Sequence, residues 1–248
     1  MALPFGTRAA IFLRLLAIQG SWNYETLLGN GIGFCLEPAL RRLPGGRDGA
    51  AYREALARQS QYFNAHPYMA AAAVGALARA ELDGEPPERI IRFRTALCGP
   101  LGSVGDRLVW ASWLPLCSIV ALGAFGLGAG AVGTVLIFLA LYNLGHFGLR
   151  LWALQAGYTH GLRVAAALGS PVLRNGPTIL ARTGALLGGL SLPLVLDRII
   201  GPGRAVFGVV LLAATVGGVL LARLHGRVEG WKIAIGILAC FVLYAVIR

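Results

Sequence analysis

The chain has 248 residues, of which 56% are hydrophobic and only 13% are charged, and its net charge is +11. Because a soluble globular domain carries about 25% charged residues, this composition indicates a membrane protein and excludes a large soluble core. Apart from Lys232, the basic residues are scattered arginines without a basic stripe, so contacts with anionic lipid headgroups explain the charge better than nucleic-acid binding does.

Residues 1–95 carry most of the acidic side chains, and we expect them to form an N-terminal interfacial region of amphipathic helices. The first such helix is predicted to lie on the membrane surface, with Arg8 and Arg14 outside and four apolar side chains facing the lipid. These four are Ile11, Phe12, Leu15 and Leu16.

Residues 50–62 predict a second amphipathic helix, because Tyr52, Leu56 and Phe63 recur at helical spacing and Glu54 can pair with Arg58. We expect the helix to end at His66-Pro67, since the residue before a proline avoids helical backbone angles. A short helix over residues 69–80 and a polar loop over residues 83–89 are predicted to follow.

Residues 96–248 are predicted to form the membrane-embedded body. No Asp, Glu, Lys or Arg occurs between Leu108 and Leu149, which leaves room for two spans or a re-entrant hairpin that turns within residues 123–133. The later apolar segments, over residues 183–196, 205–222 and 233–247, are short or marginal for spanning. The expected fold class is an all-α polytopic integral membrane protein with interfacial helices, discontinuous or re-entrant hairpins and transmembrane helices.

The sequence CGPLGSVGDRLVW, residues 98–110, resembles a phosphate loop but lacks its Gly-Lys-Ser/Thr ending, so phosphate binding there is not expected. We predict a structural break instead. Gly99, Gly102 and Gly105 would permit irregular, closely packed backbone, Pro100 would stop the preceding helix and Asp106 would start the next. Asp106 is either a helix cap or a functional acid beside an apolar segment, and both readings stay open.

Nothing in the sequence has the pattern of a catalytic or metal site. The four histidines and the four cysteines lack metal-ligand and disulfide spacing, and the second half has too few acids for a carboxylate pair. We therefore expect no metal and no cofactor, and we expect any chemistry to occur on a partner.

Several polar side chains beside apolar segments are candidates for a substrate pathway. Amides and carboxylates give the directional hydrogen bonds that sugar hydroxyls need, but they serve equally well to tie helices together. Trp22 is also typical of an aromatic belt at the membrane interface. The candidates are Trp22, Asn23, Glu25, Asn64, His66, Asp106, Arg107 and Asn143.

Four stretches, at residues 19–43, 62–78, 98–110 and 141–161, resemble in order the IID membrane component of the mannose/fructose/sorbose-type sugar phosphotransferase system (PTS). The C-terminal residues 229–248 are similar to the closing hydrophobic helix of that family. The resemblance implies a multi-pass subunit in the bacterial cytoplasmic membrane that forms an oligomeric permease with a IIC subunit. It also implies that cytosolic IIA and IIB partners phosphorylate a sugar of the hexose class and that the IID chain itself is not phosphorylated.

Three features depart from the family pattern. Arg107 stands where the family usually has proline or a small residue, Leu114-Pro115 lacks a preceding arginine, and residues 175–228 are shorter than in relatives. Arg107 could replace the missing arginine as the partner of Asp106 or of a polar group on IIC. The alternatives are a non-transporting regulatory or scaffold subunit and, last, a membrane enzyme acting on lipid-linked substrates. The arginines at positions 41–42 and 89–94 are predicted to face the cytoplasm.

Overall fold

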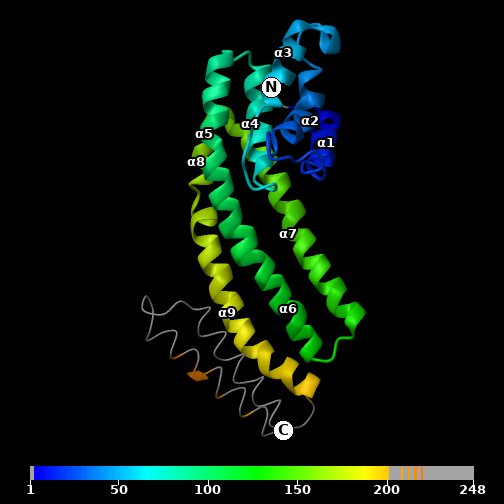
Figure 1. Ribbon diagram of the computed structural model, residues 1–248, viewed down its shortest axis with the longest axis vertical. Coiled ribbons are helices and arrows are strands. Elements are labelled where there is room, and N and C mark those ends of the chain that lie inside the picture. The colour runs from blue at the N-terminus through cyan, green and yellow to red at the C-terminus, as the bar shows by residue number, and fades with distance from the viewer. Residues whose placement is uncertain (1–2, 201–207, 209–211, 213–214, 217–218, 220–248) are drawn as a thin grey trace. The chain divides into compact units, whose positions relative to one another are not determined.

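A computed structural model describes residues 3–200 and the single positions 208, 212, 215, 216 and 219 (Figure 1). In these residues the regular structure is helical, which confirms the predicted all-α class. The helices are α1 (Phe5–Leu15), α2 (Gly29–Leu40), η1 (Gly46–Asp48), α3 (Ala50–Gln59), α4 (Ala70–Leu82), α5 (Pro87–Gly105), η2 (Asp106–Trp113), α6 (Leu114–Gly126), α7 (Ala131–His160), η3 (Gly161–Arg163), α8 (Val164–Leu168) and α9 (Pro171–Ile200).

The N-terminal helix α1 forms as predicted, but its apolar stripe faces protein and not lipid. Ile11 and Leu15 are fully buried in the core, because α1 packs against α2, and Phe12 lies against the same core. The large apolar side chains of α1 that remain exposed are Phe5 and Leu13. The prediction that this helix lies on the membrane surface with Ile11 and Leu15 facing the lipid is therefore wrong.

Helix α3 is shorter than predicted and ends well before His66-Pro67. Arg58 does not pair with Glu54. Its guanidinium reaches α4, where its Nη2 lies 2.8 Å from a carboxylate oxygen of Glu81. The buried carboxylate on α4 is a better partner than the exposed Glu54, since less water competes for the arginine.

The predicted alanine-rich helix is confirmed as α4, and it is buried along almost its whole length. Its small residues let α7 approach closely. A Cβ on Gly75 would collide with the carbonyl of Leu154, and one on Gly157 would collide with the carbonyl of Ala72. The two helices thus touch backbone to backbone, as small residues allow.

The predicted break at residues 99–106 is absent. Helix α5 continues through Pro100 into η2 and α6 (Figure 1). Proline removes one backbone hydrogen bond but keeps a helical φ angle, so the helix passes it. Asp106 does not begin a separate helix, because its position lies inside a continuous helical stretch. A Cβ on Gly99 or Gly102 would meet nothing within 4 Å, so only Gly105 is closely packed.

Among the residues that the structure describes, three continuous helical stretches are long and apolar enough to cross a membrane: Pro87–Gly126, Ala131–Leu168 and Pro171–Ile199. The first two are joined by a turn inside residues 123–133, as predicted. The apolar segment at residues 183–196 is not too short to span, because α9 starts at Pro171 and continues through Arg174 and Arg182.

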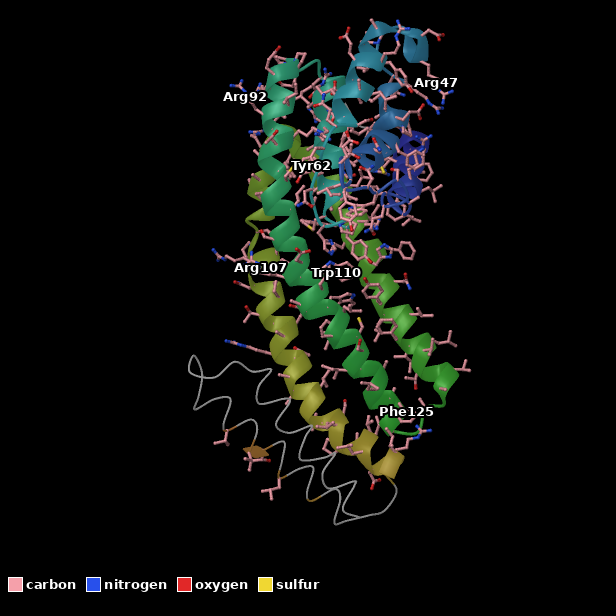
Figure 2. The ribbon with its side chains drawn as sticks, viewed as in Figure 1. Arg47, Tyr62, Arg92, Arg107, Trp110 and Phe125 are labelled. Carbon is pink, nitrogen blue, oxygen red and sulfur yellow. The ribbon has the colours of Figure 1, made fainter. Side chains whose placement is uncertain are left out.

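The apolar segments at residues 205–222 and 233–247 and the C-terminal stretch 229–248 lie outside the continuously described part. The proposed boundary at residues 95/96 falls within α5, and the division into 1–95 and 96–248 stays a prediction. The chain groups into one compact unit of residues 1–119 and 135–186 and a second of residues 120–134 and 187–248. Within the second unit, Arg198 donates to the carbonyls of Phe125 and Ala129 at the end of α6 (Phe125 is labelled in Figure 2).

Candidate functional site

A cluster of aromatic, histidine and arginine side chains lies where the segment before α4, η2 and α7 meet. We call it the polar joint, and it consists of His66, Tyr68, Trp110, Tyr142, His146 and Arg150. Its α7 members are spaced four residues apart, so they share one face of that helix.

Tyr68 is the centre of the polar joint. Its hydroxyl lies 2.6 Å from the hydroxyl of Tyr142, and its ring centroid lies 4.3 Å from that of His146. The guanidinium of Arg150, only 3% exposed, lies over the Tyr68 ring at 4.6 Å. In the described residues no carboxylate forms an ion pair with Arg150, and its Nε and Nη1 atoms are buried without a hydrogen bond. A cation held in this way is stabilised mainly by the aromatic face.

His66 lies on the side of the joint that faces α5. Its Nδ1 accepts a hydrogen bond from the Tyr68 backbone N–H at 3.2 Å, so the neutral ring carries its proton on Nε2, which is buried without a partner. Burial lowers the pKa of His66 to about 4, and the positive charge of Arg150 adds to this shift. The ring packs 5.0 Å from Trp110, and a Cβ on Gly105 would collide with it.

An apolar cavity of about 180 Å³ adjoins the joint. Its wall residues are Tyr68, Leu108, Val109, Trp113, Gly145, His146, Leu149 and Leu180. The indole N–H of Trp113 is buried without a hydrogen bond, while the ring lies directly over Gly145. The cavity therefore has an apolar surface with unsatisfied nitrogen atoms on two of its wall residues, Trp113 and His146.

The helix is widened to a π-helix along η2, a feature often found at functional sites. The Ser112 hydroxyl lies 2.8 Å from the carbonyl of Arg107 and 3.2 Å from the carbonyl of Pro177 on α9. The serine hydroxyl thus reaches a backbone carbonyl within η2 and a second one on α9, and so it connects the two helices.

Asn143 fixes the orientation of His146. The Asn143 amide donates to the carbonyl of Leu139 at 2.8 Å, which turns its Oδ1 toward Nδ1 of His146 at 3.4 Å. Because Oδ1 only accepts, the neutral imidazole carries its proton on Nδ1 and leaves Nε2 as an acceptor. That Nε2 atom is buried and has no hydrogen-bond partner in the described part of the chain.

The candidates Trp22, Asn23 and Glu25 lie in the loop between α1 and α2. The Asn23 side chain accepts hydrogen bonds from the backbone N–H groups of Glu25 and Thr26, so it stabilises the loop itself. Leu27 has a positive φ of 48° and forms a bridge with Phe63. Trp22 and Glu25 are exposed, and so is Asn64.

The sequence candidates are thus divided between two places. His66 belongs to the joint, Gly105 packs against the His66 ring, and Asn143 lies beside the joint. Asp106 and Arg107 are exposed, and Figure 2 shows Arg107 pointing outward from the helix. Of the two alternatives for Arg107, the pair with Asp106 is absent from the ion pairs of the described residues. Arg107 Nε instead lies 3.2 Å from the carbonyl of Ser103.

Sequence reasoning missed most of the joint. The signal that could have found it is the spacing of Tyr142, His146 and Arg150, three polar groups on one face of an otherwise apolar helix. No group of three His, Cys, Asp or Glu residues within the described chain could hold a metal ion. The contacts of the joint hold α7, η2 and the segment before α4 together.

A second polar network stabilises the N-terminal helices. Glu37 on α2 lies within ion-pair distance of Arg14 at 2.9 Å, Arg41 at 2.5 Å and Arg47 at 3.0 Å (Arg47 is labelled in Figure 2). Burial opposes ionisation, but hydrogen bonds from Arg41 and Arg47 and the charge of Arg14 prevail and lower the Glu37 pKa to about 2. Arg94 similarly fixes the segment before α4 by donating to the carbonyls of Gln59, Gln61 and Tyr62.

The four sequence stretches singled out above meet at these contacts. Residues 19–43 join 62–78 through Leu27 and Phe63, residues 98–110 reach His66, and residues 141–161 supply the α7 face. Long apolar helices around a buried polar joint define the class as helical membrane proteins.

Comparison with known proteins gives the family. The profile of the PTS mannose/fructose/sorbose family IID component matches residues 5–191. The mannose-specific EIID component of Escherichia coli (strain K12) is 32% identical over 202 residues, covering 76% of this chain and 70% of that protein. The fructose permease IID component of Bacillus subtilis (strain 168) is 30% identical over 203 residues, covering 77% and 72%. The chain belongs to the IID component family.

Two solved structures are similar over 99% of this chain. One, described only as a membrane protein, has a TM-score of 0.70 and 25% identity and is covered over 98% of its length. The other belongs to the mannose transporter ManYZ in complex with microcin E492. It has a TM-score of 0.59 and 23% identity, is covered over 97% of its length, and supports the fold.

Proposed function

We propose that this chain is the IID subunit of a sugar-transporting PTS permease and forms the translocation unit with a IIC subunit in the bacterial cytoplasmic membrane. The observation that carries the proposal is the family match over residues 5–191. Three of the four stretches that resemble the family supply the polar joint, and the fourth contacts Phe63 through Leu27. Several candidate spans support a multi-pass chain.

The chain acts without chemistry of its own. A cytosolic IIB partner, supplied by IIA, phosphorylates a sugar of the hexose class, and this chain contributes the membrane framework. The joint supports that role, because its aromatic and hydrogen-bond contacts lock the α4 approach, η2 and α7 into one arrangement. Asp106, Asn64 and Asn143 remain proposed pathway residues.

We place the IIC contact on a groove between η2 and α9, with a volume of about 500 Å³. Small side chains form its floor, Ala111, Ser112, Ala181 and Ala185, and two arginines line it, Arg107 and Arg182. Small residues let a partner helix approach closely. Neither arginine forms an ion pair within the described part of the chain, so an acidic side chain on the partner would complement them.

Co-purification tests this assembly. The tagged chain, co-expressed with the IIC subunit of the same bacterium, should retain IIC in mild detergent. Arg107→Gln combined with Arg182→Gln should weaken retention, whereas Arg92→Gln, on the exposed side of α5 in Figure 2, should not. If the wild-type chain does not retain IIC, the assembly is wrong. If the double variant retains it fully, only the groove assignment is wrong.

A further inference from the structure

A second pocket, of about 200 Å³, lies between α1, α4 and α7. Its walls combine two arginines, Arg8 and Arg79, two polar side chains, Gln155 and Thr159, and two leucines, Leu3 and Leu154. We propose that this pocket binds the phosphate group of an anionic membrane lipid. The proposal rests on the proposed placement of this chain in the cytoplasmic membrane, and it adds a defined lipid site.

Positive charge dominates the pocket. Arg8 donates to the Gln155 side-chain oxygen at 3.3 Å, and no carboxylate pairs with it in the described residues. Arg79 uses its Nε for the Asp83 carboxylate, and its guanidinium carbon lies 5.8 Å from the Tyr158 ring. Since a guanidinium has five N–H groups, the terminal nitrogens of Arg79 remain for a second acceptor. Two arginines against one carboxylate leave a net positive site, which matches a phosphodiester.

The remaining walls suit a lipid phosphate. The Gln155 amide donates to the Thr159 hydroxyl oxygen at 3.2 Å, so the hydroxyl proton is left to donate to a ligand. Leu3 and Leu154 are buried and give an apolar wall for the glycerol carbons beside the phosphate. The volume corresponds to about seven waters at roughly 30 Å³ each, which is enough for a phosphate with its ester carbons.

The position along α7 places the pocket at headgroup level. About 20 helical residues cross the hydrocarbon core, so a span that starts at Ala131 ends near residue 151. Gln155 and Thr159 come one to two turns later. A soluble phosphate ester offers the same oxygens, but the apolar wall and this depth favour a lipid.

Native mass spectrometry of the full chain, purified with IIC, tests the site. After exchange into micelles that contain phosphatidylglycerol or phosphatidylcholine, the wild-type protein should retain phosphatidylglycerol preferentially. Removing one arginine near an anionic headgroup should lower retention about fivefold. We expect this from Arg8→Gln and from Arg79→Gln, whereas the exposed Arg92→Gln should match the wild type.

Three results would overturn the site: equal retention of the two lipids, retention unchanged in both pocket variants, or an equal loss in Arg92→Gln. Glycerol 3-phosphate is the soluble probe. If it binds the wild-type chain in an arginine-dependent manner while the two lipids are retained equally, the ligand is a free phosphate ester and the lipid assignment is wrong. Arg8→Gln keeps the proposal testable if Arg79→Gln unfolds, because Arg8 contributes only one long hydrogen bond. Retention of IIC, measured in the same sample, separates failure of this site from failure of the permease assembly.

Discussion

The N-terminal helices and the polar joint differ in how their buried charged side chains are paired. Glu37 and Glu81 are each matched by arginines within 3.0 Å. Arg150 faces an aromatic ring instead, and in the described residues one ring nitrogen each of His66, Trp113 and His146 (Nε2, Nε1 and Nε2) has no hydrogen-bond partner. The first region pairs both of these carboxylates within itself and serves as a support, although Gln59 Oε1 and Arg94 Nε are buried there without a hydrogen bond in the described residues. The second retains unused hydrogen-bonding capacity, which is the expected condition of a region that acts on something else.

The largest expected effect comes from breaking a satisfied pair. Glu81→Gln leaves Arg58 without its carboxylate in a largely buried site, and we expect a loss of roughly 3 kcal/mol in the free energy of unfolding. Thermal unfolding of the purified protein in detergent measures it. Glu54→Gln, at an exposed position on α3, is the control and should change stability by less than about 0.5 kcal/mol. Equal effects of the two variants would contradict the distinction.

Overpacking the joint should have the next largest effect. Gly105→Ala places a Cβ against the His66 ring, and we expect a destabilisation of about 1–3 kcal/mol. Gly99→Ala and Gly102→Ala are matched controls on the same helix, because their added Cβ atoms meet open space. The same thermal measurement applies, and a loss at Gly99 comparable to that at Gly105 would show that the helix, not the His66 contact, requires glycine.

Acid should destabilise the two regions in different pH windows. The folded-state pKa of His66 lies near 4, below its usual 6.5, so the unfolded chain binds a proton first. Stability therefore falls as the pH drops from about 6.5 to 4, and His66→Gln should remove this dependence. Glu37, whose pKa is lowered to about 2, gives stability that is lost as the pH falls from 4.5 toward 2. Unfolding midpoints between pH 4 and 8 test the first window, and an unchanged slope in the variant would refute it.

The smallest effect concerns the hydrogen bond at the centre of the joint. Tyr68→Phe and Tyr142→Phe each remove one hydroxyl, and each should cost about 1 kcal/mol. The double variant should cost little more than either single one, because both lose the same bond. Additive losses in this double-mutant cycle would mean that the hydroxyls act independently.

The helical membrane class followed directly from composition, because a charge-free run longer than one span leaves few alternatives. Helix α4 and the turn at residues 123–133 were also predictable, since alanine and glycine act through local backbone preferences. The predicted break at Pro100 was wrong. The rule that a proline stops a helix considers only the local sequence, whereas here the helix continues past the proline. The joint depends on the close contact of α4 and α7 at Gly75 and Gly157. This contact brings Tyr68 against Tyr142, which lies more than seventy residues later in the sequence. Local periodicity carries no signal for such a pairing.

The substitution Asp106→Ala distinguishes a role of Asp106 in transport from a role in protein stability. Since Asp106 is exposed within a continuous helical stretch, the variant should accumulate normally, and any loss of uptake would then assign it to the pathway or to the IIC contact. Reduced abundance with proportionate uptake would instead indicate a structural role.

The most direct test of the central claim is sugar uptake by vesicles that contain IIC, with IIA, IIB and a phosphoryl donor inside, with and without this chain. We predict that hexose phosphate accumulates only when the chain is present. Equal accumulation without it, or none from an intact assembled complex, would contradict its assignment as the IID subunit of a sugar permease.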